Sequence, residues 1–266
     1  MNMVVCVKQV IDPEAPPTSF RIDLGTDKVA QLPGVSLVLD PYAEYAVEAA
    51  LRIKDAQGGK ITAIALGTNL LRDVVKKPLA MGVDELILLE DEAFEGGDSW
   101  STAYALAMAI KKIGAHDIIF CGREASDWNA GQVGSGIAEI LGLPSITLAR
   151  KIDIANGKAT VKRGTDVGYE VVEVSLPTLI TVSNEIGEPR YPTIKGIMAA
   201  KKKDPVIWKP ADIGVNPSQI GFSGRRIKMH RLFQPVREVN CEIIEGETPE
   251  EAGVNLALKL REAGIL

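Results

Sequence analysis

In the first 150 residues, two patterns of hydrophobic and polar positions follow each other in turn. Short, nearly continuous apolar runs such as "KITAIAL", "ELILL" and "DIIFC" predict buried strands. Between these runs, apolar residues recur every three or four positions and predict helices; the stripe at 43–51 is one example. Continuous apolar strands that alternate with helices are typical of a parallel sheet covered on both faces. The pattern therefore predicts an α/β fold.

The expected elements follow from these periods. Strands are predicted at 3–10, 60–66, 85–89 and 117–121, and helices at 41–55, 69–81, 99–113 and 132–141. Asp98 is a favourable N-cap for the third of these helices.

After Pro144 the pattern changes to short strands at 145–153, 159–164, 169–174 and 176–182. Asn156-Gly157 predicts a hairpin turn between the first two of them. A final helix is indicated by a capping box of Thr248 and Glu251, with Pro249 at its first position and Gly264 after its last turn.

The stretch at 204–235 is rich in Pro and Gly and has few periodic apolar residues. Alone it would bury little surface, so we expect it to lie against the chain's own core or against a partner chain, and we favour the partner.

Charge and special residues narrow the function. The net charge of −5 disfavours nucleic acid as the main partner, because a polyanion binder needs a basic excess. The three cysteines are far apart without a CxxC motif, so neither a zinc ribbon nor a thioredoxin-type site is indicated. The two histidines lack metal-ligand spacing, and we expect no metal site. With neither a signal peptide nor a run long enough to span a membrane, we expect a soluble cytoplasmic protein.

Ligands of open parallel sheets bind at the carboxyl ends of the strands, near the point where the strand order reverses. The loops at that edge are predicted at 8–12, 39–43, 66–69 and 122–131.

The last of these loops begins "CGREASDWNAGQVGSG" and runs into a helix. Gly122 permits a close backbone approach, and Asp127 and Asn129 offer polar side chains. Backbone N–H groups at 131–134, where the helix starts, attract phosphate. The spacing matches neither the Rossmann nor the P-loop motif, so a glycine-rich turn without a ligand stays an alternative.

The sequence as a whole resembles the beta subunit of electron-transfer flavoproteins. The resemblance rests on "CVKQVID", "LDPYAEYAVEAALRIKD", "MGVDELILLED", "CGREASDWNAGQVG" and "NEIGEPRYPTIKGIMAAKKK". It implies a Rossmann-like sheet of the adenine-nucleotide alpha-hydrolase type with a C-terminal arm that wraps a partner. It also implies a heterodimer with an alpha subunit, passing electrons between flavin dehydrogenases, such as acyl-CoA dehydrogenases, and an acceptor.

The family implies the cofactors as well. The alpha subunit holds most of the redox FAD, whereas the beta subunit binds AMP in many members and a second FAD in the electron-bifurcating members. We favour FAD here, because the segment around Gly221 looks more like the bifurcating type. No residue set predicts bond-making catalysis, so the chain is expected to be a carrier, and NADH oxidation is expected only with a second FAD.

By motif match and the loop argument, cofactor contacts are assigned to Cys6, Lys8, Asp40, Pro41, Tyr42, Ala43, Leu66, Gly122, Arg123, Glu124, Ala125, Ser126, Asp127, Trp128, Asn129, Ala130, Gly131, Gln132, Val133, Gly134 and Arg225. Family members often have Asn at the position of Asp40. Trp128 is expected either to stack on a ring or to pack in part. Arg225 is expected to hold a pyrophosphate or to pair with acids of the alpha subunit.

The stretch "NEIGEPRYPTIKGIMAAKKK" predicts a docking site. Ile194, Ile197 and Met198 share one face of a short helix, and exposed apolar residues rimmed by charge are typical of protein contacts. In the resembled family this is the recognition loop for a dehydrogenase, with Ile194 as anchor; Tyr191 and Lys201 complete the predicted surface. The lysines at 201–203 would steer an acidic partner or simply complement the helix end.

Three parts are therefore expected: an α/β nucleotide-binding domain at 1–190, a recognition loop at 191–203, and an arm with a helix at 204–266 that packs on the alpha subunit. The alternative function is a non-redox sensor that binds AMP or ATP on the same fold.

Overall fold

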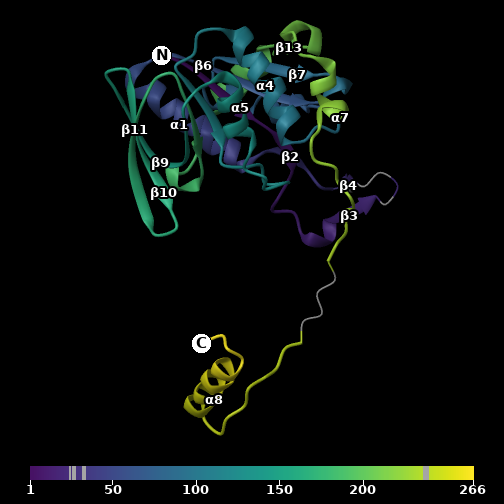
Figure 1. Ribbon diagram of the computed structural model, residues 1–266, viewed down its shortest axis with the longest axis vertical. Coiled ribbons are helices and arrows are strands. Elements are labelled where there is room, and N and C mark those ends of the chain that lie inside the picture. Colours follow the sequence, from purple (N-terminus) through teal and green to yellow (C-terminus); the bar gives the residue numbers. More distant parts are fainter. Residues whose placement is uncertain (24, 26–27, 32–33, 236–239) are drawn as a thin grey trace. The chain divides into compact units, whose positions relative to one another are not determined.

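The computed structural model describes residues 1–23, 25, 28–31, 34–235 and 240–266 (Figure 1). The chain divides into two compact units, Met1–His230 and Arg231–Leu266. This division separates compact parts and does not test the partner roles predicted for 191–203 and 204–266.

A nine-stranded sheet forms the centre of the first unit, in the order β11-β10-β9-β12-β8-β1-β6-β7-β13. Its strands are β1 (Asn2–Val7), β6 (Lys60–Gly67), β7 (Glu85–Glu90), β8 (Ile118–Gly122), β9 (Ser145–Ala155), β10 (Lys158–Thr165), β11 (Gly168–Ser175), β12 (Thr178–Val182) and β13 (Val206–Trp208). Neighbours from β9 to β13 in this order pair in parallel, whereas β10 is antiparallel to both β9 and β11. The predicted α/β class with a Rossmann-like parallel sheet is confirmed.

Among the described residues, four short strands lie outside this sheet. They form two antiparallel pairs: β2 (Gln9–Ile11) with β5 (Leu37–Leu39), and β3 (Phe20–Asp23) with β4 (Lys28–Gln31). The first pair extends the end of β1, so the loop after β1 is itself structured.

The strand order reverses at β1. The chain proceeds from β1 to β6 and β7 on one side, then crosses to β8 and later β12 on the other. Crossovers that leave a strand in opposite directions open a crevice at the carboxyl ends of that strand and its neighbour. The crevice is therefore expected where β1 and β8 end.

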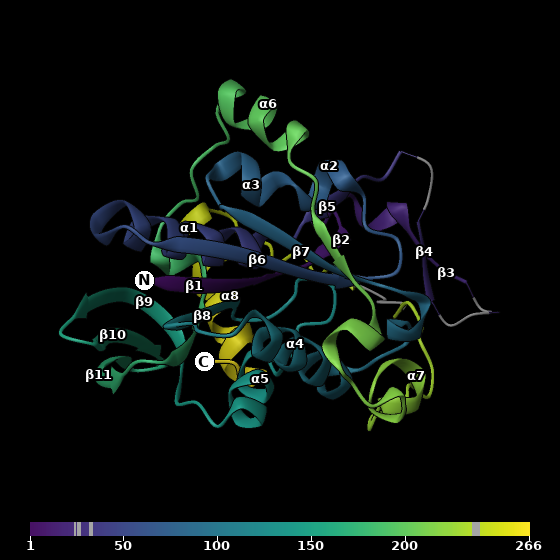
Figure 2. The ribbon, with the colours of Figure 1, turned by 90° about the horizontal axis from the view of Figure 1, so that it is seen from above.

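Helices cover both faces of the sheet (Figure 2). On one face α1 (Pro41–Gln57), α2 (Arg72–Val75) and α3 (Lys77–Met81) share a buried core with β1 and β6. On the other, α4 (Ser99–Ile113) and α5 (Val133–Leu141) pack on the residues of the opposite side of the same strands. Alanines line α1 and α4, which lets both helices approach the sheet closely.

The prediction of one continuous helix at 69–81 is wrong. It is two short helices, and the break follows from Pro78 in the first turn of α3. Proline has no N–H to donate and fits the first turn of a new helix better than the interior of an old one. Asn156 and Gly157, by contrast, form the predicted hairpin turn, both with positive φ (51° and 72°).

The chain after the predicted recognition loop packs largely on its own core. β13 adds to the sheet beside β7, and the segment continues through η4 (Pro210–Ile213), η5 (Pro217–Gln219) and α7 (Gly221–Gly224). Ile213, Val215 and Ile220 are buried in the core under α4. Isolated apolar residues without a helical period therefore anchor this part to the chain's own core, and the preferred contact of the stretch with a partner chain stays a prediction.

The second unit contains α8 (Pro249–Glu262), none of whose residues is buried. Thr248 caps it through its hydroxyl, 3.2 Å from the Glu251 amide. The Glu251 carboxylate accepts from the Glu247 amide rather than from Thr248, so the predicted capping box is shifted by one residue. Among the described residues, no helix combines the length and hydropathy that crossing a bilayer requires.

Candidate functional site

The carboxyl edge of the sheet brings together residues from three strand ends and two helix starts. Lys8 follows β1, Leu66 lies near the end of β6, and Gly122 ends β8. The Lys8 ammonium lies 2.7 Å from an oxygen of Asp127, so an ion pair ties the end of β1 to the loop after β8. The predicted residues of the two loops thus meet at the switch point of the sheet.

Asp40 is the best-satisfied polar group of this edge and is only 1% exposed. Its Oδ1 accepts from the amides of Tyr42 (2.9 Å) and Ala43 (3.4 Å) and so caps α1. Its Oδ2 accepts from both the amide and the hydroxyl of Ser126, each at 2.7 Å. The carboxylate predicted to touch a cofactor is therefore engaged on both oxygens, and it fixes the loop after β8 to the start of α1.

Glycines let the backbone segments of the site approach one another. A Cβ on Gly122 would lie 2.9 Å from the Tyr42 carbonyl carbon, so β8 ends directly against the start of α1. A Cβ on Gly134 would lie 2.8 Å from the Thr181 methyl group, which explains how α5 begins close to β12. Gly131 has a φ of +63°, a left-handed conformation that favours glycine.

The start of α5 carries free backbone donors. No side chain caps this helix, and its first intrahelical bond runs from the Gly136 amide to the Gln132 carbonyl, at 2.9 Å. The N–H groups of the preceding turn, Val133 to Ser135, have no acceptor within the helix. Uncapped donors at the positive end of a helix suit a phosphate.

The loop between Gly122 and α5 presents its middle to solvent. Trp128 is 62% exposed, so its ring does not pack in the core of this chain and is free to stack. Asn129, Ala130 and Gln132 are exposed as well, whereas Ser126 is partly buried. The loop is therefore anchored at its base by Asp40 and Lys8 and open at its tip.

Arg123 contacts two other predicted residues of the site. Its guanidinium lies 5.4 Å from the Tyr42 ring centroid and pairs with Glu124 at 2.7 Å. Within the part of the chain that the structure describes, Arg225 lies beside Phe222 of α7, 4.8 Å from the ring centroid, and makes no contact with the loop. Its assignment to the cofactor stays a prediction.

Cys6 and Cys121 are neighbours at the same edge. β1 and β8 pair in register from Met3 with Ile118 to Val5 with Phe120, and the two thiols follow at the next position. Contact with Cys6, together with burial, raises the pKa of the Cys121 thiol well above its ordinary value. Cys121 is therefore a protonated, buried side chain.

The predicted docking residues lie on and before α6 (Ile194–Lys202), which packs on α3. Tyr191 is 93% and Ile194 is 80% exposed, and Ile197 and Met198 are exposed too. The predicted apolar face is thus open to solvent.

Contacts at both ends of α6 hold this helix in position on the domain. A Cβ on Gly196 would lie 2.3 Å from the Ala80 carbonyl oxygen, and the Lys203 ammonium donates to the Asp84 carbonyl at 2.9 Å. An exposed apolar face on a well-seated helix is a preformed contact surface.

Sequence reasoning missed a charge cluster that joins α1 to the segment before α6. Glu48 is 4% exposed and accepts from Arg190 and Arg52. Burial alone would raise the pKa of Glu48, but hydrogen bonds from both arginines outweigh it and hold the pKa below the ordinary value. The available signal was a glutamate inside the apolar stripe of α1, with Arg52 four positions later.

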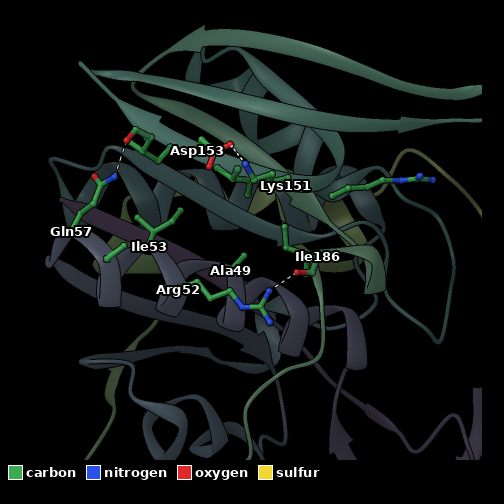
Figure 3. A pocket seen from close by; sticks show the side chains of 11 residues that line it. Ala49, Arg52, Ile53, Gln57, Lys151, Asp153 and Ile186 are labelled. Atoms are coloured by element: carbon green, nitrogen blue, oxygen red, sulfur yellow. Dashed lines mark hydrogen bonds and ion pairs between the residues drawn. The ribbon is translucent and has the colours of Figure 1, made fainter.

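A cavity of about 300 Å³ opens beside this cluster, between the second half of α1 and β9 (Figure 3). It is lined by Ala49, Arg52, Ile53, Ala56, Gln57, Arg150, Lys151, Ile152, Asp153, Ile154 and Ile186. Its arginines and Lys151 are paired with carboxylates. Because the predicted cofactor contacts lie at the first turn of α1, this cavity is separate from them.

Comparison with known proteins agrees with the fold. Residues 33–213 match the model of the electron transfer flavoprotein domain. An electron transfer flavoprotein subunit beta of Thermoanaerobacterium thermosaccharolyticum is 39% identical, with 100% of both chains covered. The CarD subunit of the caffeyl-CoA reductase-Etf complex of Acetobacterium woodii is 38% identical over 100% of both chains.

A further relative, the electron transfer flavoprotein subunit beta of Megasphaera elsdenii, is 38% identical over 96% of this chain and 95% of its own. The family match covers the strands of the nine-stranded sheet other than β1, together with the loop after β8, and these relatives extend it to nearly the full length. The chain therefore belongs to the electron transfer flavoprotein family, among its beta subunits.

Proposed function

We propose that the chain works as the beta half of a heterodimer that passes electrons between a flavin dehydrogenase and an acceptor. The full-length similarity to beta subunits carries this proposal. A stand-alone AMP or ATP sensor is not favoured, because two relatives match the chain over its whole length, with the docking helix and the C-terminal unit inside the matched range. The test is electron transfer from an acyl-CoA dehydrogenase, reduced with its acyl-CoA substrate, to the purified heterodimer. A heterodimer that carries its full flavin but accepts no electrons would contradict the proposal.

The nucleotide of this subunit is proposed to lie at the carboxyl edge around β1 and β8. The free amides at the start of α5 suit its phosphate, and the exposed Trp128 suits a stacked ring. The contacts of Asp40 with Ser126 and of Lys8 with Asp127 would hold the loop in place. A flavin bound here or in the alpha subunit supplies the redox chemistry, and this chain supplies position and docking.

FAD rather than AMP is the proposed nucleotide of this subunit, and NADH-driven electron bifurcation is proposed only for that case. The likeness of the segment around Gly221 to the bifurcating type supports it, and one relative is named as part of a reductase-Etf complex. Anaerobic reconstitution of the nucleotide-stripped heterodimer with FAD tests this. Uptake of a second FAD, followed by NADH oxidation, is the expected result; failure to take up a second flavin would rule it out.

The exposed face of α6 is the proposed docking site for the dehydrogenase. Ile194→Ala should raise the KM for the reduced dehydrogenase, because truncation of a central apolar anchor commonly costs an interface about 2 kcal/mol or more. Nucleotide content should not change. Val171→Ala, on the similarly exposed β11, is the matched control. Equal KM values for the two variants would argue against docking through α6.

The second unit is proposed to pack on the alpha subunit. Val254 and Leu258 lie one turn apart on α8 and are both exposed in this chain, which supports a partner that covers them. Leu258→Asp should lower the yield of heterodimer when the two subunits are co-expressed. Undiminished yield, measured by gel filtration, would count against this contact.

A further inference from the structure

A buried carboxylate on α1 is held by the residue that directly precedes the docking surface. The Glu48 side chain accepts three hydrogen bonds from Arg190: from the backbone amide at 3.1 Å, from Nε at 2.8 Å and from Nη2 at 3.3 Å. The same Nη2 lies 2.8 Å from an oxygen of Asp55. Loss of one partner of a buried pair is costly, because the remaining charge stays out of water. Arg190 is therefore fixed in both its main chain and its side chain.

A second arginine of α1 holds the main chain just before Arg190. Arg52 donates from Nε to Glu48 at 2.8 Å, from Nη1 to the Ile186 carbonyl at 2.6 Å and from Nη2 to the Glu188 carbonyl at 3.0 Å. Figure 3 shows the Arg52 guanidinium directed at Ile186. Two arginines and one buried glutamate thus fasten residues 186–190 to the middle of α1.

The fastened segment leads straight into the exposed docking residues. Tyr191 follows Arg190 and is 93% exposed, Pro192 restricts the backbone after it, and Thr193 caps α6 through the Gly196 amide at 3.0 Å. With the seat of α6 on α3, the docking surface is held at both ends.

We infer that Glu48 and Arg190 form a positioning pair that sets the conformation of the docking surface before the dehydrogenase arrives. This inference rests on the proposed docking role of α6. A free 186–193 segment would have to be ordered when the partner binds, and that cost would be subtracted from the affinity. With the pair in place, the segment is already ordered in the folded chain, so this entropy cost does not reduce the affinity for the dehydrogenase. The pair therefore affects affinity for the partner and leaves electron transfer within the bound complex unchanged.

The experiment measures electron transfer from an acyl-CoA dehydrogenase to the heterodimer, with kcat and KM determined separately. Arg190→Met should raise KM by roughly tenfold at unchanged kcat and unchanged nucleotide content. Arg190→Lys should recover part of the loss, because it keeps the charge but not the planar fork. Arg163→Met, which removes an arginine paired at 3.1 Å with Glu170 on the β10–β11 hairpin, is the matched control.

Because Arg190→Met leaves Glu48 short of partners and can impair folding, Glu48→Gln/Arg190→Met is made in parallel. It removes the charge together with its partner and should also raise KM.

The outcomes separate this inference from the docking proposal. If Ile194→Ala raises KM and neither Arg190 variant does, the positioning pair is refuted and docking through α6 stands. If Arg190→Met lowers kcat or nucleotide content, or if Arg163→Met raises KM as much as Arg190→Met does, the effect is general destabilisation and the inference is refuted. Unchanged KM in Ile194→Ala refutes docking through α6 and the inference with it. A raised KM at constant kcat, partly recovered by Arg190→Lys, supports it.

Discussion

The Asp40 carboxylate has two roles: it caps α1 and it anchors the loop after β8. Asp40→Asn separates these roles. Asn and Asp are about equally good N-caps, so the start of α1 should be preserved through the oxygen that faces Tyr42. The amide NH2 group replaces the oxygen that accepts from the Ser126 amide at 2.7 Å. Two donors then face each other, and the anchor of the loop after β8 is lost.

The expected magnitude follows from the bonds involved. The Ser126 hydroxyl can rotate and accept from the new amide group, so the bond from the Ser126 backbone amide to the carboxylate is the one lost. A hydrogen bond to a charged group contributes about 1.5–3 kcal/mol. If the loop must be ordered to bind a nucleotide, affinity should fall roughly 10- to 150-fold.

The assay is calorimetric titration of AMP into the nucleotide-stripped heterodimer, together with amide hydrogen exchange of residues 123–132. Asp40→Asn should weaken AMP binding and speed exchange in this loop. Asp91→Asn, which changes another N-cap (Ala93 amide at 3.0 Å), is the control and should do neither. Unchanged AMP affinity with unchanged exchange in Asp40→Asn would refute the anchoring role.

Three further predictions address the site, the charge cluster and the docking surface. Gly122→Ala should destabilise the heterodimer by about 1–3 kcal/mol, because its Cβ would meet the Tyr42 backbone; an unaltered melting temperature would show that this approach is looser than described. The pKa of Glu48 is lowered on folding, so its contribution to stability is complete above its ordinary pKa of 4.5 and is lost as the pH falls through the lower folded value. Thermal melts of Glu48→Gln should therefore depend less on pH below about 4.5 than those of the native heterodimer, and parallel curves would contradict this. Lys201→Glu should slow association with an acidic dehydrogenase and weaken its salt dependence, as stopped-flow mixing would reveal; a rate equal to that of the native protein would exclude steering by this lysine.

Local signals account for the parts of the fold that sequence predicted well. The N-cap at Asp98 and the apolar period after it gave the bounds of α4, and the glycine-rich run after β8 gave the loop at the switch point. These features depend on residues close together in the chain. Apolar and polar periods also placed the strands whose ends meet at the edge.

Contacts between distant segments were the parts that sequence could not supply. Glu48 and Arg190 are 142 positions apart, and no period links them. β13 has only three residues and is a strand because it pairs with β7. A run of three residues is too short to predict such a pairing from sequence. The roles of Asp40 show the same limit: the motif placed it at the site, and only the fold revealed that both of its oxygens are occupied.

The nucleotide content of the heterodimer tests the central claim most directly. The heterodimer of this chain with its alpha subunit would be purified without added nucleotide and denatured, and the released compounds would be quantified by chromatography. The account predicts one nucleotide in addition to the FAD of the alpha subunit, with a second FAD expected and AMP the alternative. A heterodimer that is active in electron transfer, yet releases one FAD and no second nucleotide, would contradict a nucleotide site at the edge of β1 and β8.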